Sequence, residues 1–200
     1  MVAPSLLASS DEGGRVCITK LGGCGPLPTL SPACAPLQLG APAQVLCWAP
    51  DSLRLFAGVG CTVVELILPP LTGHCGGDGG GGAAAPAPPP PPPFPPRTLA
   101  TCDDEVSALS AHASLLAAAD DSGAVTLVDT GGRRSARVLR RGGHTSLATA
   151  VLLGSGAAFS GGCDARLLAW DAAGAVREPA GEVALPAALA ECRAARRCGQ

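Results

Sequence analysis

The sequence is poor in aromatic residues and in lysine. Phe, Trp and Tyr together make up 2% of the 200 residues, Tyr is absent, and Lys20 is the only lysine. Because aromatic side chains bury the most area, a core here must be built mainly from Leu and Val. The net charge of -2 excludes the strong positive field that favours nucleic acid as a partner. The one concentration of positive charge is typical of a solvated sheet edge, and it comprises Arg133, Arg134, Arg137, Arg140 and Arg141.

The chain also lacks a long apolar run and a metal-binding cysteine motif. No stretch of about 18 apolar residues occurs, and residues 1–10 lack a basic segment followed by an apolar one, so neither membrane spanning nor secretion is expected. No cysteine pair has C-x2-C spacing, and the lone His74-Cys75 pair cannot close a tetrahedral zinc site. We therefore expect no metal, no cofactor and an intracellular protein, cytoplasmic or nuclear, with free thiols. The ten cysteines are Cys17, Cys24, Cys34, Cys47, Cys61, Cys75, Cys102, Cys163, Cys192 and Cys198.

The most informative stretch runs from Gly143 to Asp171, GHTSLATAVLLGSGAAFSGGCDARLLAWD. It contains three runs of strand length, separated by turns, which predict a β-meander. A helix is disfavoured because each of its glycines would cost about 1 kcal/mol relative to Ala. The predicted strands are Ala148–Leu153, Ala157–Ser160 and Arg166–Trp170, with a tight turn at Gly161–Ala165.

Four residues in this stretch carry a family resemblance. His144 follows a glycine, Ser160 lies on the second strand, Asp164 lies in the turn six residues before Trp170, and Trp170 precedes an Asp. This pattern resembles one repeat of the WD-repeat family, a β-propeller fold with a period of about 40 to 45 residues. The resemblance implies that the four side chains form a structural hydrogen-bonded set. The alternative is a catalytic triad of His144, Ser160 and Asp164, but that hypothesis leaves Trp170 unexplained.

Two earlier stretches are similar in shape but lack the signature residues. Leu6–Lys20 predicts the second and third strands of a blade whose first strand is missing, with an outer strand near Leu37–Leu39. In it Thr19 stands where the family has Trp, and Gly13 where it has the turn Asp. Gln44–Leu68 predicts a second meander with Trp48 as a core residue, its strands being Val45–Trp48, Leu53–Gly58 and Cys61–Leu68.

Arg97–Thr130 predicts a third repeat, with an outer strand near Thr98–Thr101 and an acidic turn at Asp103–Glu105. Asp120 and Asp121 in this repeat are the residue types of a metal site or of an acid/base pair. The following Ser-Gly favours ordinary turn chemistry between two strands instead.

Residues 69–96 change composition abruptly to glycine and then proline. Such a segment packs no core and is expected to be a disordered insert ending in a stiff polyproline rod. Its PxxP registers offer an alternative function, docking to SH3 or profilin-type domains through Pro88, Pro91 and Pro93. At the C-terminus, the stretch from Pro186 to Cys198 favours a short helix, with the outer strand of a fourth blade as the alternative.

Together with the resemblance, these patterns predict an all-β propeller segment of about four blades, the first incomplete. The resemblance implies that this segment is part of a seven-bladed ring. The predicted divisions are 1–68 for blades one and two, 69–96 for the insert, 97–175 for blades three and four, and 176–200 for the tail. The resemblance implies a non-catalytic scaffold for protein partners, with no small-molecule substrate. It also implies a candidate role as a cullin-4 ubiquitin-ligase substrate receptor, which reaches the DDB adaptor through a WD-x-Arg motif. Here Ala172 and Ala173 follow Trp170-Asp171, so the Arg is absent.

Overall fold

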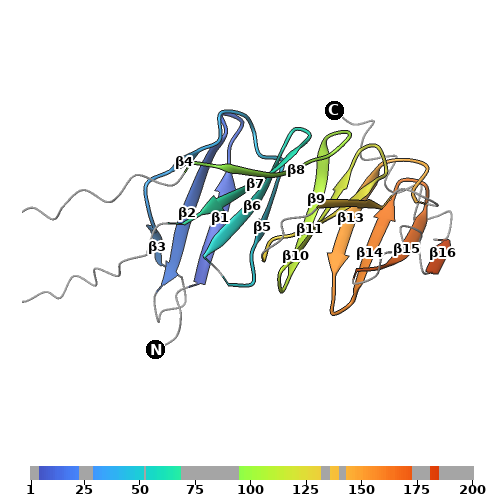
Figure 1. Cartoon of the computed structure of the whole chain (residues 1–200). Helices are drawn as coiled ribbons and strands as arrows, with labels where there is room; N and C mark the ends of the chain where they lie inside the picture. The colour runs from blue at the N-terminus through green and yellow to red at the C-terminus, as the bar shows by residue number, and fades with distance from the viewer. Residues whose placement is uncertain are drawn as a thin grey trace, which may run out of the picture.

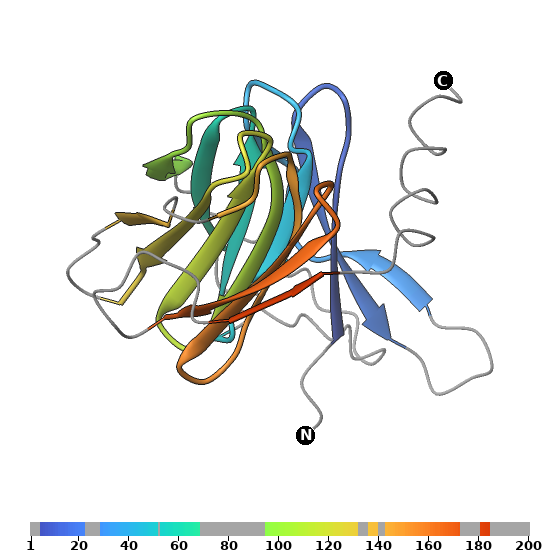
Figure 2. The ribbon, with the colours of Figure 1, turned by 90° about the vertical axis from the view of Figure 1, so that its right-hand side faces the viewer.

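The computed structural model describes residues 5–22, 29–51, 53–68, 95–131, 136–139, 143–172 and 181–184. Within these ranges the chain forms sixteen strands, arranged as four antiparallel sheets. The sheets stand side by side in chain order, with the first and the fourth at opposite ends of the row (Figure 1). Seen along the row, they overlap one behind another (Figure 2). Among the described residues there is no helix long and apolar enough to span a bilayer.

The first sheet is narrower than the others. One edge of β2 pairs with β1, and the other edge pairs with β3 and then with β4, so the sheet is three strand positions wide. In the described part of the chain nothing pairs with the free edge of β1. The predicted blade without a first strand has this arrangement. Its strands are β1 (Ser5–Ser10), β2 (Arg15–Gly22), β3 (Thr29–Pro32) and β4 (Leu37–Gln38).

The second sheet has the order β5-β6-β7-β8, and it corrects the predicted division at residue 97. The strand after the insert is predicted to belong to the unit 97–175, but β8 pairs with β7, with Thr62 opposite Thr101 and Glu65 opposite Arg97. The strand that pairs with the outer edge of β7 is thus the first strand after the insert. The insert therefore interrupts the second sheet. The strands are β5 (Val45–Trp48), β6 (Arg54–Val59), β7 (Thr62–Ile67) and β8 (Arg97–Thr101).

The third and fourth sheets are regular four-stranded meanders. Gly181–Ala184 pairs with β15 as the outer strand of the fourth sheet, so this sheet continues past the predicted division at residue 175. The stretch from Pro186 to Cys198, for which a helix or an outer strand is predicted, lies outside the described residues. The third sheet contains β9 (Val106–His112), β10 (Leu115–Asp120), β11 (Val125–Asp129) and β12 (Ala136–Leu139). The fourth contains β13 (Ala148–Leu153), β14 (Ala157–Gly162), β15 (Arg166–Asp171) and β16 (Gly181–Ala184).

The core lies between the sheets, because successive side chains on a strand point to opposite faces. Leu55 packs in the cluster toward the first sheet, while its neighbour Phe56 packs in the cluster toward the third. Trp48, predicted as a core residue, is half-buried at the margin of the cluster between sheets one and two. Four antiparallel sheets in series, each buried against its neighbours, constitute part of a β-propeller, which confirms the predicted fold class.

Candidate functional site

The structure brings the four signature residues of the fourth sheet together. His144 lies ahead of β13, Ser160 on β14, Asp164 in the turn between β14 and β15, and Trp170 on β15. The Nδ1 atom of His144 is 2.9 Å from Asp164 Oδ1, and its Nε2 atom is 2.8 Å from Ser160 Oγ. Trp170 donates from Nε1 to the same Ser160 oxygen at 2.8 Å. One chain of hydrogen bonds thus joins the loop, the turn and two strands.

Donor and acceptor roles in this set follow from its geometry. The Asp164 carboxylate can only accept, so His144 donates to it from Nδ1, and the neutral imidazole then accepts at Nε2 from the Ser160 hydroxyl. The indole N–H of Trp170 can only donate, so Ser160 Oγ also accepts from Trp170. Trp170 and Ser160 are each 1% exposed and His144 is 8% exposed. Among the described residues every buried side-chain nitrogen and oxygen has a hydrogen-bond partner.

Asp164 also anchors the backbone around it. Its Oδ2 accepts from the Thr145 N–H at 3.0 Å and its Oδ1 from the Arg166 N–H at 3.2 Å. The neighbouring Gly162 has no room for a side chain, because a Cβ there would lie 2.5 Å from His144 Nδ1 and 2.7 Å from Asp164 Oδ1. The histidine and the carboxylate occupy the volume above that glycine.

The acid sensitivity of the fold is expected to depend on Asp164. Burial raises the pKa of its carboxyl, but the donors Thr145 N–H, His144 and Arg166 N–H outweigh burial and hold the pKa below 3.8. A folded-state pKa below the unfolded value means that the ionised carboxylate stabilises the fold above the unfolded pKa. This contribution is lost as the pH falls through the folded pKa. Below about pH 4 the wild type should therefore lose unfolding free energy more steeply than Asp164→Asn.

Urea unfolding at a series of acidic pH values measures this difference. Asp51→Asn is the matched control, because the Asp51 carboxyl also has a lowered pKa but lies in the turn between β5 and β6 of the second sheet. Burial raises the pKa of Asp51, but the hydrogen bonds from the Leu53 N–H and the Arg54 side chain lower it by more than burial raises it. Equal slopes for the wild type and Asp164→Asn would contradict the prediction.

The set has the connectivity of a serine protease triad, with Ser to His Nε2 and His Nδ1 to Asp. A nucleophilic serine must also reach a substrate. Ser160 Oγ lies inside the contact between the third and fourth sheets, and it already accepts from Trp170.

A second buried carboxylate, Asp120, anchors the corresponding turn of the third sheet. The hairpins pair Ala119 with Val125 and Gly161 with Leu167, with the same number of residues between, so Asp120 stands where the fourth sheet has Gly162. It is 1% exposed, and its Oδ2 accepts from the Asp103 N–H at 3.3 Å. Asp103 is the counterpart of Thr145, whose N–H Asp164 binds. Two different positions thus supply the carboxylate for one task.

The turn of the first sheet is anchored in the same way as the turn of the third, by an Asp that accepts from backbone N–H groups. Asp11 stands at the position of Asp120, and its Oδ1 accepts from the N–H groups of Gly13 and Arg15 at 3.0 and 2.9 Å. Asp120 Oδ1 accepts from the N–H groups two and four residues on, Ser122 and Ala124, at 3.0 and 3.1 Å. The shared signal in the sequence is an Asp three residues before a glycine, in DEGGR and DDSGA. The turn predicted at Asp120 and Asp121 is therefore present, but the sequence gives no sign that the Asp120 carboxylate is buried.

Sequence reasoning also missed a buried ion-pair network on the second sheet. Glu65 on β7 is 5% exposed and lies between Arg54 Nη1 at 3.2 Å and Arg97 Nη1 at 3.6 Å. Arg54 also pairs with Asp51 at 2.7 Å and donates to the Thr130 carbonyl of the third sheet at 3.4 Å. A single Glu within an apolar run was the available signal. No group of three or more His, Cys, Asp or Glu side chains that could hold a metal ion occurs in the described ranges.

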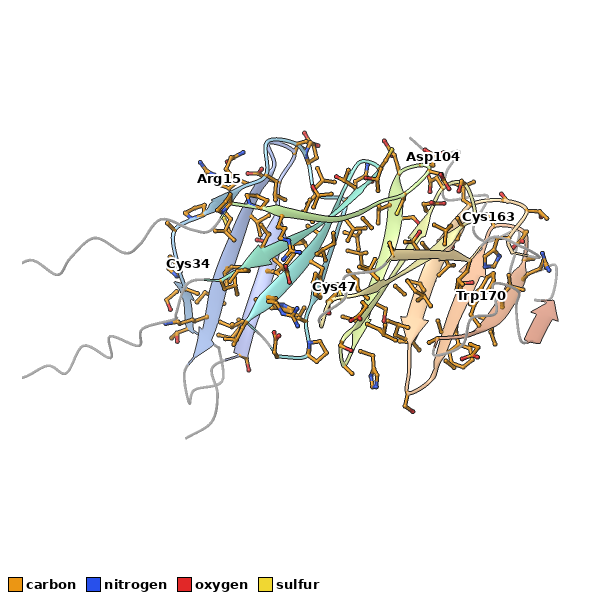
Figure 3. The ribbon with its side chains drawn as sticks, viewed as in Figure 1. Arg15, Cys34, Cys47, Asp104, Cys163 and Trp170 are labelled. Atoms are coloured by element: carbon orange, nitrogen blue, oxygen red, sulfur yellow. The ribbon has the colours of Figure 1, made fainter. Side chains whose placement is uncertain are left out.

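One face of the molecule, which we call the turn face, carries the turns β1–β2, β6–β7, β10–β11 and β14–β15 and the loops that lead into β9 and β13. Arg15, Asp104 and Cys163 lie along this face (Figure 3). Glu12 and Asp104 are exposed on it. The predicted docking residues Pro88, Pro91 and Pro93 lie outside the described residues.

No protein-family model matches the sequence. No curated protein is significantly similar to it. Solved structures do match: a crystal structure of the mitotic checkpoint complex aligns with a TM-score of 0.58 at 19% identity, over 89% of this chain and 50% of that one. The computationally designed Ika8 protein aligns with a TM-score of 0.61 at 16% identity, over 93% of this chain and 48% of that one. This chain therefore spans about half the length of the structures it matches, and the likeness shows that its fold is a partial β-propeller.

Proposed function

We propose that the protein is a non-catalytic WD-repeat scaffold that binds protein partners through its turn face. This proposal rests on one observation: the side chains that resemble a catalytic triad are fully engaged in hydrogen bonds within the fold. Ser160, His144 and Asp164 are saturated by one another, by Trp170 and by backbone N–H groups inside the sheet contact. Their role is to fix the turn and the loop that form the surface. The four-residue pattern also supports the WD-repeat assignment.

The turn face suits a partner that carries positive charge. Sheets one, three and four each present a short turn there, fixed by Asp11, Asp120 and Asp164. The carboxylates of Glu12, in the turn of the first sheet, and of Asp104, in the loop ahead of β9, are exposed on this face. Rigid turns with exposed charges bind with little loss of conformational entropy.

A quantitative pull-down from an intracellular extract tests this surface. The double variant Glu12→Lys with Asp104→Lys should lose the partners that the wild type retains, because both charges reverse without any change in the core. Leu53→Ser, an exposed substitution at the turn between β5 and β6, is the matched control. Unchanged recovery with the reversed charges would exclude the turn face as the binding surface.

The variant Ser160→Ala separates the structural role of Ser160 from a catalytic one. It should lower the free energy of unfolding by about 1 kcal/mol, as expected for a lost hydrogen bond, and leave partner recovery unchanged. Urea unfolding and the same pull-down provide the two readouts. A hydrolytic activity that disappears in Ser160→Ala at unchanged stability would contradict a non-catalytic protein.

A finer candidate within the same function is a substrate receptor of cullin-4 ubiquitin ligases. The run from Asp103 to Thr130, followed by a step into a WD-ended repeat, resembles WD repeat-containing protein 53. The DDB adaptor should then be recovered in the pull-down beside a known receptor. Its absence there, with the known receptor still bound, would exclude this candidate.

Docking through the polyproline stretch is the competing function, and a deletion distinguishes the two. Because β8 pairs directly with β7, an antiparallel connection of a few residues suffices for the second sheet. Removing residues 86–96 should leave the sheet and the partners of a turn-face scaffold intact. Loss of SH3 or profilin-type partners on that deletion would favour the docking adaptor.

A further inference from the structure

The two end sheets expose the faces that inner sheets bury. Phe159 and Leu167 of the fourth sheet are each 40% exposed, on the face that points away from the third sheet. Leu152, directly opposite Phe159 on β13, is 62% exposed. At the other end of the row, Leu7 of the first sheet is 51% exposed on the face that points away from the second.

The positions of these residues match those of buried residues in the contact between sheets three and four. The hairpin registers place Phe159 and Leu167 at the positions of Ala117 and Val125, both fully buried against the fourth sheet. Phe159 and Leu167 therefore belong to a face built to receive a following sheet.

The first sheet supplies the opposite half of such a contact. Leu7 lies opposite Thr19, as Ala158 lies opposite Trp170, so Leu7 stands at the position of Ala158. Ala158 and Trp170 are 0% and 1% exposed, because they pack against the preceding sheet. The Leu7 face is therefore built to receive a preceding sheet, and the two end faces are the two sides of one kind of contact.

One molecule cannot join its own end faces, because they lie at opposite ends of the row (Figure 1). The chain also aligns with 50% and 48% of the two solved structures that it matches, so the part of each structure that it leaves uncovered is about the size of this chain. A second copy has that size and carries both faces in the required order. We propose that two copies of this chain bind head to tail, the fourth sheet of each against the first sheet of the other, and close a ring through two equivalent contacts.

The mass of the 200-residue protein in solution tests this proposal. Sedimentation equilibrium and native mass spectrometry should give twice 19.6 kDa for the wild type. Phe159→Glu and Leu7→Glu should each give 19.6 kDa with an unchanged far-ultraviolet circular dichroism spectrum, because each places a charge in both contacts and neither side chain is buried within one copy. Leu53→Glu, at a position that is 64% exposed and remote from both end faces, should remain a dimer.

Mixing the two monomeric variants distinguishes head-to-tail from face-to-face association. The Phe159→Glu copy keeps an intact first sheet and the Leu7→Glu copy an intact fourth sheet, so one unaltered contact can form between them. The mixture should therefore regain dimer, whereas neither variant does so alone.

Three results would overturn the proposal. A wild-type mass of 19.6 kDa throughout the micromolar range would leave these faces to further sheets or to another protein. A dimer that Leu7→Glu does not disturb would show a contact between like faces. A ladder of masses above the dimer would show that the contacts do not close at two copies. None of these results depends on whether the turn face binds a partner.

Discussion

Replacing Trp170 with Ala is expected to lower the free energy of unfolding by about 3–5 kcal/mol, the usual cost of deleting a large buried side chain. The indole is 1% exposed and packs between the third and fourth sheets with Leu168, Leu139 and Val125. Its loss would leave a cavity in a core otherwise filled by small aliphatic side chains. It would also remove the N–H donor to Ser160. Urea unfolding followed by circular dichroism measures the change.

Two further variants separate the cavity from the hydrogen bond. Trp170→Phe keeps most of the apolar volume and should cost about 1 kcal/mol for the lost donor, with a further contribution from imperfect packing. Trp48→Ala is the control for tryptophan loss in general, and it should cost less because Trp48 is half-buried at the margin of its cluster. Equal losses for Trp48→Ala and Trp170→Ala would show that Trp170 has no special place in the core.

Asp120→Ala is expected to lower the free energy of unfolding by about 3 kcal/mol, because it leaves four donors, one buried and three part-buried, without their acceptor. The carboxylate accepts from the N–H groups of Ser122, Ala124 and Asp103 and from the Ser122 hydroxyl. Asn retains one oxygen and should lose less. The same urea unfolding measurement applies to both variants.

Asp11→Ala is the matched control for Asp120→Ala. Asp11 occupies the same turn position and accepts the same two backbone N–H groups, but it is exposed, and water can replace it. Its loss should cost at most about 1 kcal/mol. If the two alanine variants were equally destabilised, the burial of Asp120 would not be the source of its contribution.

The regular strands could be predicted from the sequence, because apolar runs of strand length are bounded by glycine and polar turns. The position of the boundary at residue 97 could not be predicted, because β7 pairs with a strand on the far side of residues 69–96, and nothing in the sequence of β7 indicates that partner. Glu65 gives no indication in the sequence that two arginines from neighbouring strands surround it. In both cases the interaction joins neighbouring strands of the sheet, and their pairing could not be deduced from the sequence.

The place of His144 could be predicted because the family resemblance names its neighbours. The burial of Asp120 could not be predicted, because Asp-Asp-Ser-Gly has the same sequence in a solvated turn as in a buried one. Only the position of β10 within the sheet contact shows that this carboxylate is enclosed. The equivalence with Asp11 and Gly162 appears once the hairpin registers are known.

The two ways of anchoring these turns exclude each other, and this constrains the order in which mutations could accumulate. The histidine of the fourth sheet requires a glycine at residue 162, while the third sheet has Asp120 at that place and Cys102 where the histidine would stand. Gly162→Asp would be tolerated only after His144 had been lost. A histidine at residue 102 would need Asp120 to have become glycine first. Repeats of one fold can thus stay in separate states, because an intermediate that holds both side chains is less stable than either end.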